Sequence, residues 1–391
     1  MNKLTTIFTG ALLAVNFNVN AGDCPTLSGN YLIGKSNADF ASISDAVKAL
    51  QCGGVTGAVN FKIEEGTYKE QVVVGTIEGA SAVNPIKFES ERGENMGVVI
   101  TTSTSDATLV LNGTSWVTFE NLTIDRKDAV SGNAIKIDGN ASHLSFKSVV
   151  FDGVETANAR EAATIYFTSN APKTYMAFED CEINNGTVGI MKNGMSADKG
   201  TSIIGSTFFN QSMAGIMLSN QDAPEISNNV ISSLSNTPGF TGIGLTAAIN
   251  NTVVSNNIVN AANGTYGISL TNCAAQATAL SQIVNNSVAV GGEKVVGLHL
   301  AGNTDNLSVN FNRIKLSIKG EQTAQQSYYK NEGSGNNVNL TNNILYDLQT
   351  GGYTIIGNTY TDFFNQLPTQ SNPSLTASAN GLMIEKVSPV K

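Results

Sequence analysis

The stretch "SNNIVN" at residues 255–260 returns three times with small changes, as "SNNVIS" at 227–232, "VNNSVA" at 284–289 and "TNNILY" at 341–346. Each copy combines two asparagines with a short aliphatic run. Aligning the chain on this motif produces a column of residues spaced 23 to 32 positions apart. The column contains Asn121, Ser148, Asp180, Ser206, Asn229, Asn257, Asn286, Arg313 and Asn343. A motif that recurs at such a period indicates a repeat architecture.

A second column with the same period is expected in the turns before short strands. It contains Gly189-Ile190, Gly215-Ile216, Gly242-Ile243, Gly267-Ile268 and Gly297-Leu298. Segments of about three to five residues alternate in polarity and are separated by Gly, Asn, Ser or Asp, which is typical of short strands. Strands this short become stable when successive units stack into long parallel sheets. The two columns therefore predict an all-β parallel β-helix of about ten coils.

The asparagine column suits a tight corner of such a coil. Asparagine tolerates the left-handed backbone conformation, and its amide can bond the amides of the coils above and below. We interpret the column as a structural ladder whose chemistry is hydrogen bonding.

The "GIML", "GIGL", "GISL" and "GLHL" strands and the ladder resemble the pectin-lyase-like superfamily of right-handed parallel β-helices, over residues 55–360. The stretch "ADFASISDAVKAL" at 38–50, followed by "FKIEEGTYKEQVVV" at 61–74, resembles the opening of pectinesterase-type members. This resemblance implies one N-terminal helix that caps the first coil, and polysaccharide substrates lying along the groove beside the "GISL" strand. The pectinesterase signature Asp-Phe-x-Phe-Gly is absent, so the resemblance specifies the fold and not the reaction.

Four segments are expected along the chain. Residues 1–21 resemble a signal peptide, with Lys3, an apolar run and a small-residue cleavage site ending at Ala21, which predicts an exported, secreted or cell-surface protein. Residues 22–57 form the N-terminal cap with its amphipathic helix, and residues 58–360 form the β-helix. Residues 361–391 close it, with Phe363, Phe364 and Leu367 expected to fold over the last coil.

The net charge limits the possible binding partners of the protein, and the cysteine positions limit its possible disulfides. A net charge of −9 argues against nucleic acid and against binding an acidic polymer by bulk charge. Cys24 and Cys52 flank the predicted helix, and in an oxidising compartment we expect them to form a disulfide, the alternative being two free thiols. Cys181 and Cys273 lie more than three coils apart, which is ~17 Å against a limit of ~7 Å for a disulfide.

Candidate site residues face outward beside the "GISL" strand. These positions are Val110, Asn112, Lys136, Asp138, Tyr166, Thr168, Met217, Ser219, Gly244, Thr246, Ser269, Thr271 and His299. Glycoside hydrolysis normally needs two carboxyl groups, and only one is among them. His299 could act as an acid, a base or a binding group, but it has no orienting carboxylate nearby in the pattern, which is typical of a surface imidazole.

The earlier coils offer one charged cluster, formed by Lys136, Asp138, Arg160, Glu161 and Tyr166. A polysaccharide lyase could use it, with Arg or Lys abstracting the proton beside a uronate carboxylate. Asp138 and Glu161 would then hold Ca²⁺. The alternative is a set of solvated loop charges with no function.

Two functions remain open. The first is a polysaccharide-binding β-helix with residual lyase-like activity, which the pectinesterase-like opening favours. The second is a non-enzymatic adhesin or structural surface rod, which the missing carboxylate pair favours.

Overall fold

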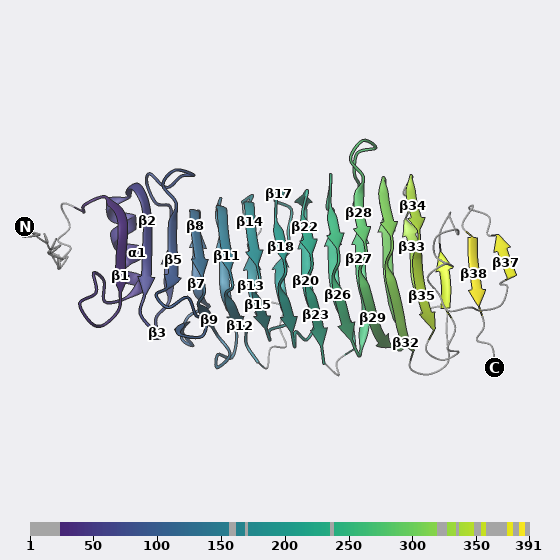
Figure 1. Ribbon diagram of the computed structural model, residues 1–391, viewed down its shortest axis with the longest axis horizontal. Helices are drawn as coiled ribbons and strands as arrows, with labels where there is room; N and C mark the ends of the chain where they lie inside the picture. The colour runs from purple at the N-terminus through teal and green to yellow at the C-terminus, as the bar shows by residue number, and fades with distance from the viewer. Residues whose placement is uncertain are drawn as a thin grey trace, which may run out of the picture.

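The computed structural model of the protein describes residues 24–155, 162–168, 171–234, 238–318, 327–333, 336–347, 353–356, 374–377 and 383–387. The signal-peptide segment 1–21 and the proposed closing residues Phe363, Phe364 and Leu367 lie outside them. The described chain forms an elongated solenoid of parallel strands, with its N-terminus at one end and its C-terminal strands at the other (Figure 1). The predicted all-β parallel β-helix is confirmed.

Three sheets run along the solenoid, and each coil contributes strands to them in the order A, B, C. Sheet A consists of β1 (Leu27–Ile33), β2 (Val55–Ile63), β5 (Ile86–Ser90), β8 (Ser115–Glu120), β11 (Ser142–Lys147), β14 (Thr174–Glu179), β17 (Asp198–Lys199), β18 (Ser202–Ile204), β21 (Gln221–Asp222), β22 (Glu225–Ser227), β25 (Val253–Ser255), β28 (Ser281–Val284), β31 (Leu307–Asn310) and β34 (Val338–Thr341). Sheet B consists of β3 (Gly66–Lys69), β6 (Val98–Thr101), β9 (Thr123–Asp125), β12 (Val150–Asp152), β15 (Glu182–Asn184), β19 (Thr207–Phe209), β23 (Val230–Ser233), β26 (Ile258–Ala261), β29 (Ser287–Gly292), β32 (Arg313–Ile318), β35 (Asn343–Asp347), β36 (Tyr353–Ile356), β38 (Met383–Val387) and β37 (Ser374–Ala377). Sheet C consists of β4 (Val72–Val74), β7 (Ala107–Asn112), β10 (Asn133–Asp138), β13 (Ile165–Phe167), β16 (Val188–Lys192), β20 (Ala214–Ser219), β24 (Phe240–Thr246), β27 (Gly264–Thr271), β30 (Val296–Gly302) and β33 (Ser327–Gly333).

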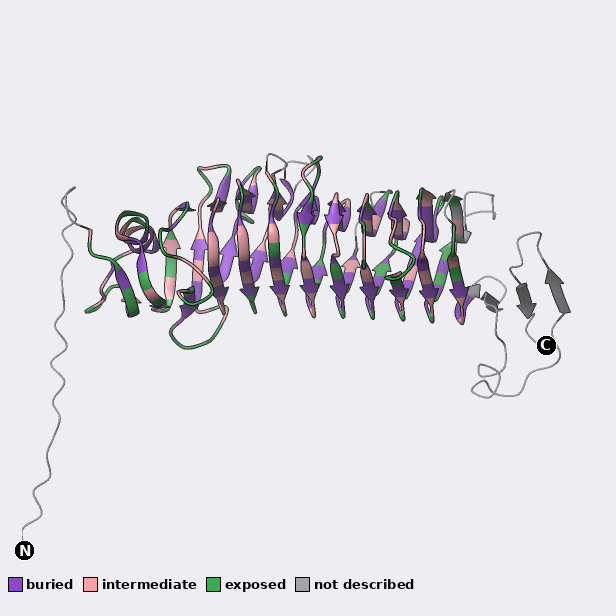
Figure 2. Ribbon diagram, turned by 90° about the horizontal axis from the view of Figure 1, so that it is seen from above, coloured by how far each residue is buried: buried purple, intermediate pink, exposed green. Residues whose placement is uncertain are grey.

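The core is a set of residue columns that run along the solenoid axis. Strand residues alternate between buried and exposed positions, so each sheet turns one face inward (Figure 2). In sheet A, Phe61, Phe88, Phe119, Phe146 and Phe178 form one buried column, with stacked ring centroids 4.7 to 5.7 Å apart. A slip of one residue would turn a strand's apolar set outward, so this stack helps to fix the register.

The glycine column lies where two sheets meet closely. A Cβ at Gly242 would come within 2.4 Å of Val259 and 2.5 Å of the Gly267 carbonyl, and a Cβ at Gly267 would come within 2.2 Å of Val288. The same crowding occurs at Gly189. Glycine is therefore required at this position so that sheet C can pack on sheet B. The expectation that these glycines lie in turns before the strands was wrong, because they lie inside strands of sheet C, as Gly242 does in β24 and Gly267 in β27. The residue after each glycine, such as Ile243, is buried in the core.

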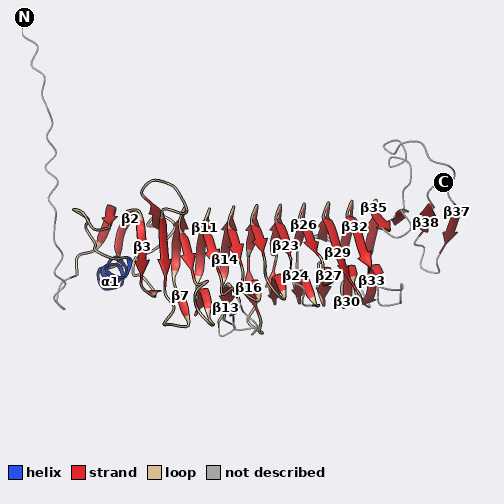
Figure 3. Ribbon diagram, turned by 90° about the horizontal axis from the view of Figure 1, so that it is seen from below, coloured by secondary structure: helices blue, strands red, loops and turns tan. Residues whose placement is uncertain are grey.

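The helix α1 (Ile43–Gly53) lies at the N-terminal end of the solenoid (Figure 3). Ser42 is its N-cap and accepts a hydrogen bond from the Asp45 backbone N–H at 3.1 Å. The Glu70 carboxylate accepts the N–H groups of Ile43 and Ser44 at 3.1 and 2.9 Å. Glu70, which directly follows β3, thus fixes the helix start, where a carboxylate also complements the helix dipole.

The cysteines follow two different chemistries. Cys24 and Cys52 form a disulfide with a Cα–Cα distance of 5.6 Å. Cys181 and Cys273 are free and buried in the core. Burial raises the pKa of the Cys181 thiol to about 12 and that of the Cys273 thiol to about 11, so both remain protonated.

The corner between sheets A and B has two adjacent columns where the sequence pattern indicated one. The outer column has left-handed backbone at Asn121, Ser148, Asp180, Gly205, Asn228, Asn256, Asn285, Phe311 and Asn342. The inner column is buried and contains Leu122, Val149, Cys181, Ser206, Asn229, Asn257, Asn286, Asn312 and Asn343. The hydrogen-bonded ladder belongs to the inner column.

In the ladder, the Nδ2 of Asn229 donates to the Oδ1 of Asn257 at 2.9 Å, and Asn257 donates to Asn286 in the same way. The chain of amides continues through Asn312 to Asn343. The assignment of Asn121, Ser148 and Asp180 to the ladder was wrong by one position, because these three residues take the left-handed turn. Arg313 was likewise misaligned by one, since Asn312 occupies the inner column. Asparagine suits both columns, for different physical reasons.

The parallel pairing ends at β35. Strand β36 pairs with it antiparallel, and β38 and β37 continue sheet B in the same antiparallel manner. In the part of the chain that the structure describes, no helix is both long enough and apolar enough to cross a lipid bilayer.

Candidate functional site

The candidate site lies on the outer face of sheet C, the face that the sequence pattern indicated. One outward row crosses the sheet by direct strand register, one residue from each coil. The row contains Val110, Lys136, Tyr166, Met191, Met217, Gly244, Ser269, His299 and Lys330. Its first part carries charge, its middle part is apolar, and its last part is polar.

A groove of about 290 Å³ opens over the middle of this row, across β16, β20, β24 and β27. Gly244 makes it hollow, because a residue without a side chain stands between Met217 and Ser269. Met191 and Tyr266 supply apolar surface. Hydroxyl and amide groups also line the groove, from Asn193, Ser219, Thr241, Thr246, Ser269 and Thr271.

A hydrogen-bonded relay stands at one end of the groove, on three successive coils. The Oγ of Ser269 on β27 lies 3.0 Å from Nδ1 of His299 on β30. The Nε2 of His299 lies 3.0 Å from Oε2 of Glu332 on β33. Tyr266 stacks on the imidazole with ring centroids 4.6 Å apart. The His299 side chain is 8% exposed, so the ring is held on both edges and covered on one face.

The charge on Glu332 determines which ring nitrogen of His299 carries the proton. A hydrogen bond from Lys330, whose Nζ lies 2.6 Å from Oε1, holds the pKa of Glu332 below its usual range, and the bond to His299 adds to this. The ionised carboxylate can only accept, so the imidazole carries its proton on Nε2. In the neutral imidazole, Nδ1 is then the acceptor for the hydroxyl hydrogen of Ser269. This is the tautomer that a base acting on a serine requires.

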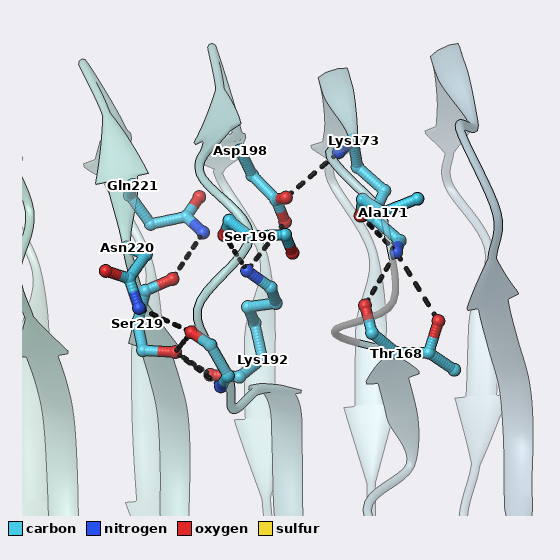
Figure 4. A network of polar contacts seen from close by, with 10 residues as sticks. Thr168, Ala171, Lys173, Lys192, Ser196, Asp198, Ser219, Asn220 and Gln221 are labelled. Carbon is cyan, nitrogen blue, oxygen red and sulfur yellow. Dashed lines mark hydrogen bonds and ion pairs between the residues drawn. The ribbon is translucent and has the colours of Figure 1, made fainter.

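A buried ionic network supports the other end of the groove (Figure 4). Lys192 falls in register between Phe167 and Leu218, so its side chain enters the interior. Its Nζ lies 3.5 Å from Oδ2 of Asp198 and donates to the Ser196 carbonyl at 2.6 Å. Both charged side chains of this pair are fully buried.

Lys173 completes the network from the preceding coil. Its backbone N–H donates to Oδ1 of Asp198 at 2.9 Å, and its Nζ donates to the carbonyls of Thr168 and Ala171. Burial lowers the pKa of both lysines and raises that of Asp198. The network ties the loop after β16 to the core, and this loop contributes Asn193 to the groove.

The predicted charged cluster is assembled differently from the expectation. Lys136 pairs with Asp106 at 3.3 Å rather than with Asp138. Asp138 accepts hydrogen bonds from the Thr168 hydroxyl at 2.7 Å and from the Gly139 N–H at 2.8 Å. Tyr166 is the register partner of Lys136. Arg160 and Glu161 lie outside the described residues. No group of three or more His, Cys, Asp or Glu within the described ranges is arranged to hold a metal ion.

The expectation that His299 is a surface imidazole without a carboxylate was wrong. The ring is buried and has both a serine and a glutamate as partners. Sequence reasoning missed Ser269 as the partner of His299, and missed Glu332 altogether. The signal was available in the spacing, because Ser269, His299 and Glu332 are separated by 30 and 33 residues, which is one coil each.

A carboxylate pair is also present, but on sheet B, which the sequence search did not cover. Asp125 and Asp152 are register partners on β9 and β12 and line a pocket of about 260 Å³ with Glu182. Burial raises the pKa of Asp152, and the charge of Asp125 adds to this effect against a hydrogen bond from Asn184.

The chain is similar to several proteins of known structure. No protein in the curated set matches the chain. Among solved structures, a GH136 lacto-N-biosidase from Eubacterium ramulus is 9% identical, with a TM-score of 0.48, and the match covers 78% of this chain and 67% of that one. PfbA, a surface adhesin of Streptococcus pneumoniae, is 12% identical, with a TM-score of 0.48 and coverage of 88% and 95%. The pectin methylesterase from Aspergillus niger is 12% identical, with a TM-score of 0.30 and coverage of 81% and 89%.

A family model described as a right handed beta helix region matches residues 107–314, which is more than half of the chain. The matched segment contains the glycine column and most of the asparagine ladder. Its coils are paired in parallel from one to the next throughout. The chain belongs to the right-handed β-helix family, in keeping with its resemblance to the pectin-lyase-like superfamily.

Proposed function

We propose that the protein is an exported β-helix protein that binds a neutral polysaccharide along the outer face of sheet C. The observation that carries this proposal is the groove across β16, β20, β24 and β27, which runs along the solenoid axis and suits an extended chain. Export rests on the signal-peptide pattern of residues 1–21 and is compatible with the Cys24–Cys52 disulfide.

The chemistry of the groove suits a sugar. Tyr266, Met191 and Met217 offer apolar surface to the C–H faces of pyranose rings, and the threonine and serine hydroxyls offer hydrogen bonds to sugar hydroxyls. Among the described residues, Lys192 is the one cation that lines the groove, and it pairs with Asp198. With a net charge of −9, the protein has little attraction for a polyanion here, so the polymer should be uncharged.

The test fills the groove without disturbing the core. A Cβ at Gly244 would meet only ordinary contacts, at 3.4 Å or more, and the residue lies outside the left-handed region. Gly244→Trp should therefore fold and occupy the hollow. Binding to neutral polysaccharides is measured by affinity electrophoresis and on a glycan array, and we expect the variant to lose at least tenfold in affinity.

The matched control is Asn260→Trp, which places the same ring on the exposed face of sheet B. Equal binding by the wild type and Gly244→Trp would remove the groove from consideration. Absence of any polysaccharide binding by the wild type would favour the alternative function, a non-enzymatic adhesin or surface rod.

A further inference from the structure

We propose that Ser269, His299 and Glu332 form a hydrolytic relay that cleaves acyl esters, and that its substrates are O-acylated sugar units of the polymer in the groove. The inference deepens the proposed polysaccharide binding and rests on it for the substrate class. The relay chemistry itself rests on the two hydrogen bonds of 3.0 Å that join the three residues.

The three residues do not belong to the hydrophobic core. They lie on the outer face of sheet C, whereas Ile268, Leu270, Leu298 and Leu300 supply the core from the alternate positions of the same strands. A polar chain across three coils on an outer face adds little to stability compared with the buried core. Its order of nucleophile, base and orienting carboxylate is the one that nucleophilic catalysis requires.

Each member has the exposure that its task needs. Ser269 is partly exposed and lines the groove, so an ester carbonyl can reach its Oγ. His299 is buried beneath Tyr266, which holds the imidazole in place beside Ser269. Glu332 is half-exposed, acts through His299 and is a positioning residue. Met191 and Met217 provide the apolar surface that an acyl chain prefers over a free hydroxyl.

The reaction divides into two balanced steps. In the first, the Ser269 hydroxyl proton moves to Nδ1 of His299 while Oγ forms a bond to the ester carbonyl carbon. The bond between that carbon and the sugar oxygen then breaks, and the sugar alkoxide takes the proton from Nδ1. In the second, a water gives a proton to Nδ1 while its oxygen forms a bond to the acyl carbon. The bond between that carbon and Oγ of Ser269 then breaks, which releases the carboxylic acid, and Oγ recovers the proton from Nδ1. Water is the only co-reactant. Hydroxyl donors that line the groove, on Thr246 and Thr271, are available for the oxyanion.

The first experiment asks whether Ser269 is an activated nucleophile. The intact protein is treated with a fluorophosphonate probe, digested and mapped by mass spectrometry. We expect a covalent adduct on Ser269 and none on Ser287, an exposed serine on sheet B without an imidazole partner. Heat-denatured protein should remain unlabelled. Absence of the Ser269 adduct from the folded wild type overturns the relay, whatever the behaviour of any variant.

The second experiment measures turnover of p-nitrophenyl acetate. Ser269→Ala and His299→Asn should each lower the rate at least 100-fold, and Ser287→Ala should leave it unchanged. Glu332→Gln should lower kcat about tenfold with KM unchanged, because the amide no longer stabilises the imidazolium that forms in the transition state. Thermal melts of each variant check folding. A Ser269→Ala variant that keeps the wild-type rate overturns the proposal.

The third measurement is the release of acetate from acetylated xylan, which separates the relay from the proposed binding function. Acetate release that is lost in Ser269→Ala supports the substrate class. Hydrolysis of p-nitrophenyl acetate without acetate release overturns the assignment to carbohydrate esters. Xylan binding by a protein that shows no Ser269 adduct overturns the relay and leaves the binding function standing.

Discussion

Replacing Asn257 by leucine tests whether the amide ladder stabilises the solenoid. The Oδ1 of Asn257 accepts the backbone N–H of Asn229 at 3.0 Å and its Nδ2 at 2.9 Å. Leucine at position 257 leaves both donors of Asn229 without that acceptor inside the core. The backbone N–H of residue 257 still donates to Oδ1 of Asn286, as it does at 3.0 Å in the wild type.

The expected cost follows from these two donors. Each buried donor left unsatisfied costs about 1 to 3 kcal/mol, and the added apolar burial of leucine offsets part of the sum. We expect the variant to lose about 3 kcal/mol in the free energy of unfolding. Leucine is accepted at the same inner column in Leu122, where the register neighbour Val149 carries no amide. The penalty therefore arises from the neighbouring asparagines and not from the size of the side chain.

The assay is equilibrium unfolding in urea, followed by circular dichroism, with amide hydrogen exchange at Asn229 as a local probe. Asn260→Leu, at an exposed position of the strand β26 that follows Asn257, is the matched control and should change the unfolding free energy by less than about 0.5 kcal/mol. A loss below about 1 kcal/mol in Asn257→Leu, with unchanged exchange at Asn229, would refute the stabilising role of the ladder.

Two further predictions concern buried charge. Burial alone would raise the pKa of Glu89, but hydrogen bonds from Lys62, Lys87 and Asn60 lower it to about 2. This lowered pKa contributes ~3 kcal/mol to the free energy of unfolding. The contribution is fully present above the ordinary pKa of about 4.5 and is lost as the pH falls through 2. In urea titrations, Glu89→Gln should therefore be less stable than the wild type at pH 7 and nearly equal to it at pH 2. Asp198→Asn should lose about 3 to 5 kcal/mol, because it removes the opposing charge from the fully buried Lys192. Asp180→Asn, on the exposed outer corner, is its control in thermal melts, and equal losses in both would contradict this account.

Periodicity made the fold predictable and left the register less certain. The glycine column is confined to one position by crowding, so its spacing was recognised, but Gly242 and Gly267 lie inside strands and not in the turns before them. The asparagine column was not confined in this way, because the outer corner selects asparagine for its left-handed backbone and the inner corner for its amide. Where the early coils carry Leu122 inside and Asn121 outside, the pattern could not separate the two positions.

The site was less predictable because its contacts join different coils. The outward direction of Lys136, Asp138 and His299 follows from strand alternation and was correct. The partners of these side chains depend on the length of each loop between coils, which the repeat does not specify. For this reason the ion pair of Lys136 with Asp106, in place of Asp138, could not be predicted. Glu332 lies beyond the last regular glycine unit, where no repeat column sets the register against His299.

The ladder also has a direction. Each asparagine from Asn229 onward receives its acceptor from the coil that follows it in the chain, through to Asn343. The last coil to form therefore has two buried N–H donors without acceptors, until the asparagine of the next coil accepts their hydrogen bonds. Because the N-terminal part of a chain leaves the ribosome first, the rungs can close in the order in which they are synthesised. The solenoid can then assemble as a one-way zipper, in which every new coil completes the one before it.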